Sequence, residues 1–376
     1  MTISFFSNHF NHHQSPVADL FYEALGEDYH YVEFEPMPQW MLNGGFDATV
    51  TRPYLIRAHE SESAMKEAKR LMDESDVVIV GHAPTSWVNR RKSADKITFD
   101  YNERWFKKPI ERIDPRRVKN IVLNYARFRK KRSYMLCASA FTARDVHSVF
   151  CFPNKTYKWG YFTKVDAVDV DEKFKSFSSR TVNMMWVSRF LDWKHPELPV
   201  LLAYRLKQKG FSFHIDMFGS GVEFDKTVSL ANKLNVLDVV SFKGNSPNEQ
   251  ILEEFRMHEI FLFTSDRGEG WGAVLSEAMA NGCAVIAGDE IGSAPYLVKD
   301  GENGHLFRSK DINSLTEKTE DLLSNREKRL LFAKKAQETM TKVWCPKVAA
   351  ERFLLLAESL LNNQEVIFKE GPCSKA

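Results

Sequence analysis

Residues 260–287 read Ile260-Phe-Leu-Phe-Thr-Ser-Asp-Arg-Gly-Glu-Gly-Trp-Gly-Ala-Val-Leu-Ser-Glu-Ala-Met-Ala-Asn-Gly-Cys-Ala-Val-Ile-Ala287. A short apolar run, 260–263, leads into a glycine-rich turn, and a helix-forming run follows from Ala273 to Asn281. Gly282 is a typical helix C-cap, and a second apolar run, 284–287, begins directly after it. This order predicts a strand, a turn, a helix and a second strand, which is the repeating unit of a parallel α/β fold.

The same alternation of short apolar runs and helical patterns continues on both sides. A chain of 376 residues exceeds the size at which one hydrophobic core keeps growing, so we expect two domains. The pattern weakens into a polar, charged segment before Thr181, where we place the connection. The expected organisation is a domain over residues 1–170, a linker over 171–181, a domain over 182–345, and a C-terminal helix and tail over 346–376. We expect the last helix to cross back to the N-terminal domain and the tail after Phe368 to be frayed. The further predicted strands are 3–6, 29–34, 77–80, 96–99, 184–187, 213–218 and 239–242.

Composition excludes several classes of protein. Hydrophobic residues make up 43% and charged residues 27%, which is typical of a folded globular chain. A net charge of +2 gives no global field that would attract nucleic acid. The five cysteines are scattered without a Cys-x-x-Cys pair, so we expect neither a disulfide framework nor a structural zinc site. Without an apolar run of about 18 residues or a secretory leader pattern, we expect a cytoplasmic protein.

The glycine-rich turn suits a phosphate or a polar sugar. Glycines 268, 270 and 272 let the backbone approach a ligand closely, and the positive end of the following helix then faces that ligand. Glu269 lies in the turn, and Glu277 lies about a turn and a half into the helix. Their carboxylates can therefore bind different parts of one molecule, and carboxylates are good partners for sugar hydroxyls.

These residues resemble the E-x7-E signature of the family 4 retaining glycosyltransferases, with Glu269 and Glu277 in the two Glu positions. The segment Met185-Trp-Val-Ser-Arg189-Phe-Leu-Asp-Trp-Lys194 resembles the strand and loop in which that family binds a donor diphosphate. His195 stands where the family usually has glycine. The resemblance covers roughly residues 182–310 and is only architectural in the N-terminal half. Further matching turns are Asp216-Met-Phe-Gly219-Ser-Gly221, Val240-Ser-Phe-Lys243-Gly244 and Leu297–Phe307.

The resemblance implies an α/β protein of GT-B architecture, with two Rossmann-like domains facing across a cleft. It implies that Arg189 and Lys194 hold the diphosphate of a nucleotide-diphosphate sugar, that Glu277 holds the ribose, and that Glu269 holds the sugar ring. The implied reaction is sugar transfer with retention, to a saccharide or lipid-linked acceptor of cell-surface polysaccharide or glycoconjugate synthesis. It needs no essential metal or other cofactor. The donor-binding residues expected are Arg189, Lys194, Gly219, Gly221, Lys243, Gly270, Trp271, Gly272, Ala273 and Glu277.

The N-terminal half supplies the candidates for acceptor contact and proton transfer. The segment after the first predicted strand carries His12 and His13, which we expect to contact the acceptor or the sugar. A metal site there is disfavoured because adjacent histidines with no carboxylate in register seldom ligate one ion. His82 and Glu103 each follow a predicted strand, and either could assist the acceptor hydroxyl. The catalytic candidates are therefore Glu269, His82 and Glu103.

The stretch 104–132 is strongly basic and interleaved with aromatic residues. An anionic lipid surface attracts such a segment with about 1 kcal/mol for each basic residue close to it. We expect peripheral contact with the inner face of a membrane, which would suit a lipid-linked acceptor, and an ordinary solvated helix face is the alternative. Nucleic acid is not an expected partner, because no recognition motif accompanies the charge.

Three other functions remain open at this point. A nucleotide-sugar epimerase of the same fold would need no acceptor, and a catalytically silent subunit would keep the fold and bind nucleotide sugar. An NAD-dependent oxidoreductase is disfavoured because strand one is not followed by G-x-G-x-x-G.

The aspartates of Asp169-Val-Asp171 are expected on a solvated loop rather than at a metal, and Cys283 is expected as an inert core residue.

Overall fold

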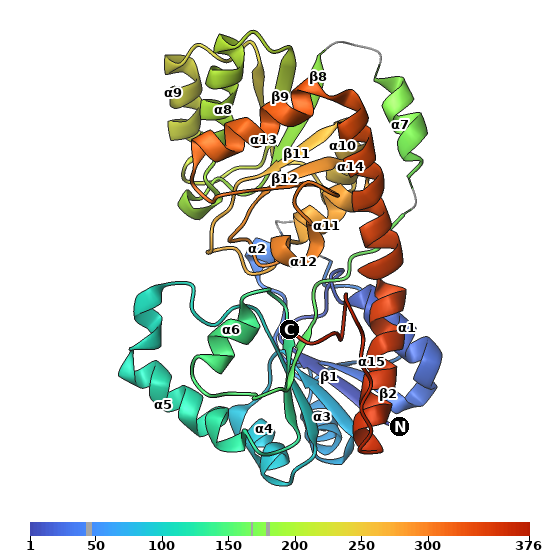
Figure 1. Cartoon of the computed structure of the whole chain (residues 1–376). Helices are drawn as coiled ribbons and strands as arrows, with labels where there is room; N and C mark the ends of the chain where they lie inside the picture. The colour runs from blue at the N-terminus through green and yellow to red at the C-terminus, as the bar shows by residue number, and fades with distance from the viewer. Residues whose placement is uncertain (43–46, 167, 178–180) are drawn as a thin grey trace. The chain divides into compact units, whose positions relative to one another are not determined.

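The computed structural model describes residues 1–42, 47–166, 168–177 and 181–376 (Figure 1). The chain divides into two compact units. Unit 1 comprises Met1–Lys164 and Trp344–Ala376, and unit 2 comprises Val165–Val343. Each unit contains one parallel sheet with helices on both faces, as the alternating apolar and helical patterns predict.

The sheet of unit 1 has the strand order β3-β2-β1-β4-β5-β6-β7. Strand β4 reads Val-Val-Ile-Val and is buried throughout, which is typical of a parallel strand covered on both faces. The strands are β1 (Ile3–Ser7), β2 (Tyr29–Glu33), β3 (Leu55–Arg57), β4 (Val77–Val80), β5 (Ile97–Asn102), β6 (Ser133–Cys137) and β7 (Thr156–Lys158). The helices are α1 (Ser15–Leu25), α2 (Gln39–Leu42), α3 (Glu62–Glu74), α4 (Thr85–Ser93), α5 (Pro115–Asn124), α6 (Thr142–His147) and α15 (Pro346–Leu361), with the short 3-10 turns η1 (Gly26–Asp28), η2 (Pro109–Arg112) and η3 (Ala126–Phe128).

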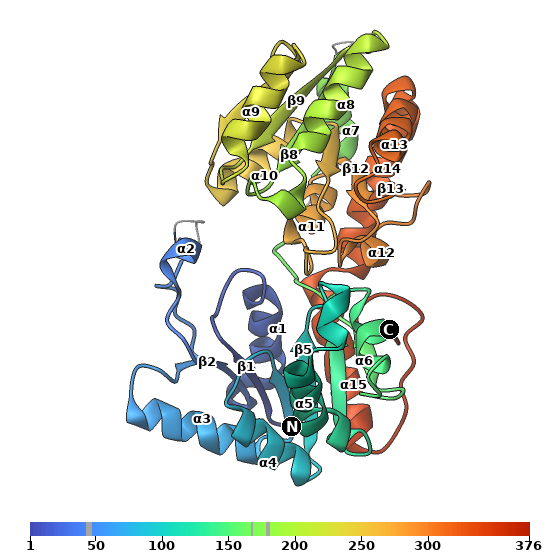
Figure 2. The same cartoon turned by 90° about the vertical axis from the view of Figure 1, so that its left-hand side faces the viewer.

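Consecutive side chains of β1 enter different cores of unit 1, because side chains alternate along a strand. Phe6 packs with Leu71 and Met72 of α3. On the other face, Phe353 of α15 contacts the rings of Phe21 at 5.4 Å and Phe99 at 5.1 Å between centroids. Helices α1 and α15 lie side by side there (Figures 1 and 2). A helix from the end of the chain therefore completes the core of the N-terminal sheet.

The sheet of unit 2 has the order β10-β9-β8-β11-β12-β13. Both sheets start in the middle, grow to one edge, and then return to the middle and grow to the other, as in doubly wound Rossmann-like folds. The strands are β8 (Val182–Val187), β9 (Phe213–Phe218), β10 (Val240–Gly244), β11 (Ile260–Phe263), β12 (Ala284–Gly288) and β13 (His305–Phe307). The helices are α7 (Val170–Ser176), η4 (Asp192–Lys194), α8 (Glu197–Gln208), α9 (Phe224–Lys233), α10 (Asn248–Arg256), α11 (Ala273–Ala280), α12 (Ala294–Leu297), α13 (Ile312–Ser324), α14 (Arg326–Glu338) and the π-turn η5 (Thr339–Val343).

The predicted strands are confirmed as β1, β2, β4, β5 and β8 to β12, and the helix predicted after the glycine-rich turn is α11. Strands β3, β6, β7 and β13 were not predicted. Three of them are only three residues long, too short for an alternating pattern to stand out. Strand β6 follows directly on the basic stretch, whose charge dominates the local pattern.

The segment expected as a linker, 171–181, mostly forms α7 and belongs to unit 2, so the units divide earlier, after Lys164. Residues 178–180 lie outside the described part of the chain. Asp169 is the N-cap of α7 and accepts a hydrogen bond from the Glu172 amide at 3.0 Å, while Asp171 pairs with Lys334 at 2.6 Å. Asp169 is thus occupied in helix capping, and Asp171 in an ion pair.

The C-terminal tail is ordered against unit 1, so the prediction that it frays was wrong. The Lys158 amide donates to the Ser374 carbonyl at 2.8 Å, and Tyr157 pairs with Lys375 in an antiparallel bridge. The Cys373 side chain is buried. The tail therefore extends the edge of the sheet beyond β7, a long-range pairing that local sequence cannot reveal. Among the described residues, no helix combines the length and the apolar character needed to cross a bilayer.

Candidate functional site

The two segments expected at the donor site leave neighbouring strands of unit 2. Segment 188–196 follows β8, segment 264–272 follows β11, and these strands pair where the chain changes direction across the sheet. Ligands of doubly wound folds bind at this switch point, outside the carboxyl ends of the strands. Trp186 Nε1 donates to Thr264 Oγ1 at 2.8 Å, and that hydroxyl donates to the Lys194 carbonyl at 2.7 Å. Hydrogen bonds therefore hold segments 188–196 and 264–272 together, and we call these two loops the rim.

Lys194 and Glu269 form an ion pair at the centre of this rim. Both side chains are largely buried, and the Lys194 ammonium also lies 4.1 Å from the centroid of the Trp193 ring. A buried cation needs such partners, because burial without them costs several kcal/mol. Arg189 lies on the same loop and is exposed. The rim thus combines two cations, of which one is preorganised by a carboxylate and an aromatic ring.

A network around Asp266 connects the loops further, and sequence reasoning missed it. His195 Nε2 lies 3.2 Å from Asp266, and its Nδ1 lies 2.9 Å from Glu197. Lys310 Nζ lies 2.6 Å from Asp266, which also accepts from the Gly268 amide at 2.8 Å. Burial alone would lower the pKa of His195, but the two carboxylates outweigh it and raise the pKa to about 9. The departure of His195 from the family's glycine was the one available signal.

Three of the expected glycines are required by close packing. A side chain at Gly219 would place its Cβ 1.9 Å from the Ser188 carbonyl oxygen, and at Gly221 2.4 Å from the Phe190 carbonyl oxygen. Gly272 has a φ of +85°, and a Cβ there would lie 2.7 Å from the Phe263 ring. These glycines let neighbouring turns touch the loop after β8 and let α11 begin directly at the sheet.

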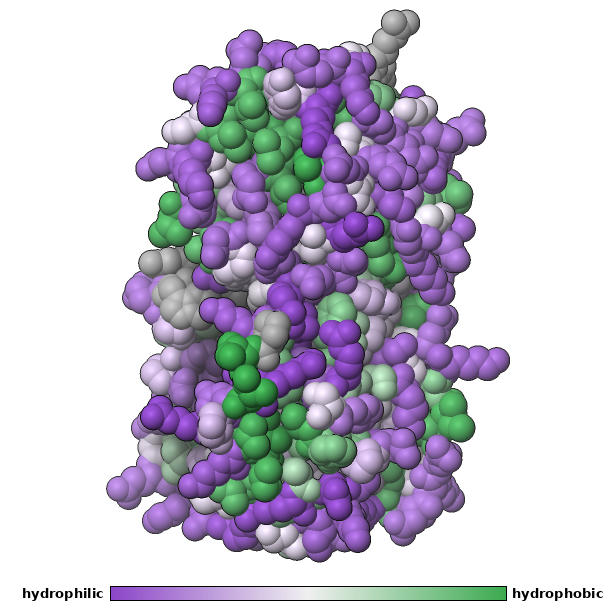
Figure 3. Space-filling model, turned by 60° about the vertical axis from the view of Figure 1, so that its left-hand side comes forward, coloured by the Kyte–Doolittle hydropathy of each residue, from purple (hydrophilic) through white to green (hydrophobic). Residues whose placement is uncertain are grey.

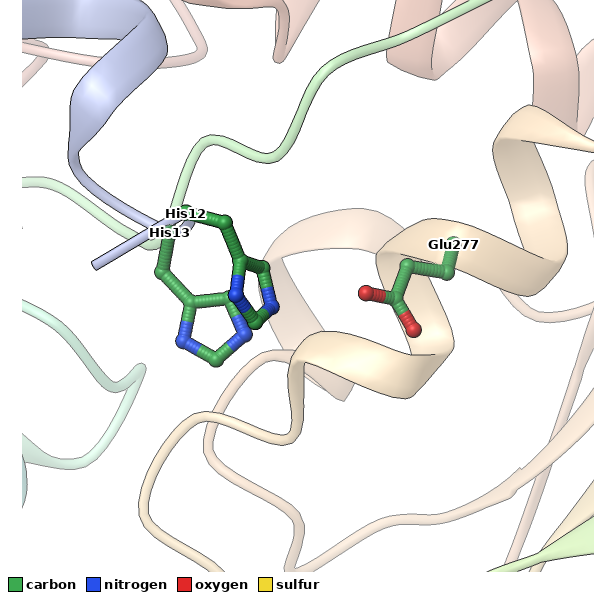
Figure 4. A group of neighbouring side chains, drawn as sticks. All are labelled: His12, His13 and Glu277. Carbon is green, nitrogen blue, oxygen red and sulfur yellow. The ribbon is translucent and has the colours of Figure 1, made fainter. Parts of the chain in front are cut away.

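Helix α11 presents the remaining predicted donor residues. Ala273 begins the helix after Gly272, so the first amides of α11 follow the Glu269–Gly270 turn directly. Glu277 lies in the second turn, and Figure 4 shows its carboxyl group projecting from the helix. Burial raises the pKa of Glu277 to about 7. The indole of Trp271 is buried, with its ring 6.3 Å from that of Tyr296, which makes it part of the support beneath the turn.

Lys243, another of the expected donor-binding residues, forms an ion pair separate from the Lys194–Glu269 pair. Its ammonium lies 3.2 Å from Asp216 of β9, which also contacts His258 at 3.1 Å. The Lys243 side chain is half-exposed. Among the described contacts, those of Lys243 join β10 to β9, while Lys194 and Glu269 join the loops after β8 and β11.

Unit 1 has a polar cavity of about 350 Å³ at the carboxyl ends of its central strands, and Glu103 contributes to its wall. Tyr161 donates to Glu103 at 2.7 Å and stacks on His13 with ring centroids 5.4 Å apart. The ring centroids of His12 and His13 lie 4.2 Å apart. Figure 4 shows the two rings as neighbours. Glu103, Tyr161 and His13 therefore form a continuous chain of contacts. The cavity is lined by Ser7, Asn8, Gln14, Gly81, Tyr101, Asn102, Glu103, Arg104, Trp105, Arg117, Ala138 and Tyr161.

His82 lines a second, smaller cavity of about 220 Å³ in unit 1. Its Nε2 lies 3.2 Å from Glu35, and about half of the His82 side chain is exposed. Gly81 and Asn102 line both cavities, so the two spaces adjoin. The structure thus places His82 and Glu103 at adjoining cavities at the same ends of the strands, and both remain candidates for assisting the acceptor hydroxyl.

Comparison with known proteins defines the class of this fold and of unit 2. Residues 170–339 match the family described as glycosyl transferases group 1, and this segment lies wholly within unit 2. Anabaena HepE in complex with UDP has a TM-score of 0.68 at 13% identity, covering 96% of this chain and 100% of that one. Sucrose-phosphate synthase from Thermosynechococcus elongatus has a TM-score of 0.68 at 16% identity, covering 97% and 100%. The chain therefore has the GT-B fold, and unit 2 is a glycosyl transferases group 1 domain.

Curated relatives match over part of their length. N-acetyl-alpha-D-glucosaminyl L-malate synthase of Bacillus anthracis is 30% identical over 197 residues, which is 52% of this chain and 49% of the relative. Poly(glycerol-phosphate) alpha-glucosyltransferase of Bacillus subtilis is 30% identical over 122 residues, or 32% of this chain and 18% of the relative. The chain thus spans about half the length of the first of these relatives and a smaller part of the second.

Proposed function

We propose that this protein is a retaining glycosyltransferase that moves a sugar from a nucleotide-diphosphate sugar to a saccharide or lipid-linked acceptor. The Lys194–Glu269 pair at the switch point of a glycosyl transferases group 1 domain is the observation that carries this proposal. A diphosphate would compete with Glu269 for the Lys194 ammonium. Glu269 would then be released to accept hydrogen bonds from the sugar hydroxyls.

In the proposed reaction, the acceptor hydroxyl oxygen bonds to the anomeric carbon as the bond from that carbon to the diphosphate oxygen breaks. The acceptor proton passes to the departing diphosphate on the same face, so the configuration is retained. Arg189, Lys194 and the first amides of α11 stabilise the charge that grows on the diphosphate. Glu277 binds the ribose, and Gly219, Gly221 and the 270–273 turn bound the nucleotide pocket, while Lys243 is assigned to its edge.

The acceptor belongs to unit 1 in this proposal. The polar cavity beside Glu103 and His13 offers hydrogen-bonding groups for a saccharide, and His82 lines the adjoining space. Either Glu103 or His82 assists the acceptor hydroxyl. We also propose that no metal is essential, because Arg189 and Lys194 supply the positive charge that a diphosphate needs. Transfer should then continue in the presence of EDTA.

Titration calorimetry with a panel of nucleoside diphosphates tests the donor site, beginning with UDP, which the related HepE structure holds. We expect one nucleotide to bind the parent, and Lys194→Ala to weaken it by about 2 to 3 kcal/mol, the worth of a hydrogen bond to a charged group. Glu277→Ala should weaken it as well. Lys226→Ala is the matched control, because Lys226 is exposed on α9.

The anomeric configuration of the transfer product, read by NMR, tests the stereochemistry. A product with the configuration of the donor supports retention, and an inverted product contradicts it. If no nucleotide binds, or if the Lys194 and Glu277 variants bind like the parent, the assignment of this site is wrong.

A further inference from the structure

The outward face of α5 in unit 1 carries aliphatic side chains that are exposed to solvent. Val118 and Val122 are four residues apart and therefore share one face of the helix, where 39% and 50% of their surface is exposed. Leu123 beside them is 45% exposed. Ile121 points the other way and is buried in a core cluster with Trp105 and Phe106. The inward face of α5 thus has its packing partners, while the outward face is apolar and open.

The turn before α5 continues this apolar surface. Ile110 is 65% exposed and Ile113 is 71% exposed. With the three exposed residues of α5, they place five large aliphatic side chains on the surface within residues 110–123. On the side of the molecule drawn in Figure 3, hydrophobic side chains form a band on unit 1, surrounded by hydrophilic side chains. We call residues 110–123 the α5 surface.

The charge around the α5 surface is mostly positive. Of its two acids, Glu111 is partly buried and its carboxylate lies 3.3 Å from Arg117. Asp114 is the exposed acid in this part of the chain, and its carboxylate accepts from the Arg116 amide at 2.9 Å as the N-cap of α5. Lys119 is exposed and neighbours Val122 and Leu123, three and four residues further along the helix, on the outward face. The exposed basic side chains in and beside the α5 surface are Lys107, Lys108, Arg112, Arg116, Lys119, Arg127, Arg129 and Lys130.

We propose that unit 1 docks on an anionic lipid bilayer through the α5 surface. A helix lying in the membrane interface buries aliphatic side chains at the boundary of headgroups and acyl chains, and basic side chains beside them contact anionic headgroups. The α5 surface has both features in one short segment. Phosphates of a nucleic acid would engage the basic residues but would leave the exposed isoleucines, valines and leucine without a role. This docking is independent of the sugar-transfer proposal.

Co-sedimentation of the full chain with lipid vesicles tests the proposal. We expect binding to phosphatidylcholine vesicles that contain about one-third phosphatidylglycerol, weaker binding when salt is raised, and no binding to phosphatidylcholine alone. Arg116→Gln/Lys119→Gln should lower the partition coefficient about thirtyfold, since each basic residue near the surface contributes about 1 kcal/mol. Val122→Ser/Leu123→Ser should lower it at least about tenfold by removing apolar contact.

Lys66→Gln/Lys69→Gln is the matched control, because both residues are exposed on α3 of the same unit. This pair should bind vesicles like the parent, and all three variants should keep the thermal unfolding midpoint of the parent. The proposal is overturned if the parent ignores anionic vesicles, or if the α3 pair loses as much binding as the α5 pairs. It is also overturned if the serine variant binds vesicles like the parent, because a purely electrostatic attraction, such as one suited to nucleic acid, would then explain the charge.

Discussion

His195 occupies a position where the resemblance leads one to expect glycine, and its backbone explains why few residues fit there. Its φ of 50° and ψ of 55° are left-handed, a conformation that glycine adopts freely and most other residues avoid. The imidazole offsets that strain by bridging Glu197 and Asp266. A residue that departs from the family therefore adds a further link between the loop after β8 and the loop after β11.

The charge of His195 should make stability depend on pH. Its pKa is raised from 6.5 to about 9 in the folded protein, so the folded state binds the proton more tightly than the unfolded chain does. The stabilisation is then fully present below pH 6.5 and is lost as the pH rises through about 9. His195→Asn tolerates the backbone but cannot carry the charge, and it should cost about 2 kcal/mol at the acidic end of this range and much less at the alkaline end. Urea unfolding of both proteins across this range measures the difference, and a difference that does not change with pH contradicts the role given to the charge.

Gly219 should be far less tolerant of substitution than a glycine in open space. Gly219→Ala would force its Cβ against the Ser188 carbonyl, whereas Gly210 has nothing within 4 Å of an added Cβ. Both have positive φ, so Gly210→Ala has only the conformational cost, about 1 kcal/mol. Gly219→Ala should lose more than about 3 kcal/mol of unfolding free energy, or displace the loop after β8 and with it nucleotide binding. Equal effects of the two substitutions on the urea midpoint and on calorimetric binding would show that the loop yields without cost.

Helix α7 illustrates what sequence reasoning could not reach at the level of secondary structure. The residues around it are polar and charged, and that composition predicts a linker. In the fold, however, the buried ammonium of Lys173 donates to the carbonyls of Phe255 at 2.8 Å, Asn281 at 3.0 Å and Gly282 at 2.7 Å. One lysine thus donates hydrogen bonds to carbonyl groups at the ends of α10 and α11. These carbonyls lie more than eighty residues away from Lys173 along the chain. The segments around the glycine-rich turn could be predicted because their strand, turn and helix are contiguous.

Lys173 and Lys175 lie on the same helix and should behave differently. Lys173→Ala leaves three helix-terminal carbonyls without their donor, and we expect a loss of about 3 kcal/mol in unfolding free energy. Lys175 is exposed and pairs with Glu172, so Lys175→Ala should change stability by less than about 0.5 kcal/mol. Urea unfolding of the two variants gives the comparison directly. A Lys173 variant as stable as the Lys175 variant would mean that water replaces the buried ammonium.

The path of the chain makes the two units unequal as folding units. Unit 2 is continuous over Val165–Val343, whereas unit 1 is assembled from both ends of the chain. The last helix and the tail complete unit 1, through Phe353 against Trp159 at 5.6 Å and through the pairing of the tail with β7. A helical pattern over 346–361 is visible in the sequence, but the sheet that it covers is set by contacts hundreds of residues away. Sequence therefore predicts the elements of the GT-B fold better than it predicts the limits of the units.

Separate fragments should show this inequality. Residues 165–343 expressed alone should unfold cooperatively in urea and bind the same nucleotide as the full chain, because they contain a whole sheet and core. Residues 1–164 alone should not unfold cooperatively, because the aromatic cluster around Phe353 and the edge pairing of the tail are missing. Joining residues 344–376 to residue 164 through a short glycine-serine linker should restore cooperative unfolding. The ring centroids of Phe162 and Trp344 lie 6.4 Å apart, so the two ends are already neighbours within unit 1. If residues 1–164 fold as well without this addition as with it, α15 covers a core that is already complete, and the discontinuous unit is not a folding unit.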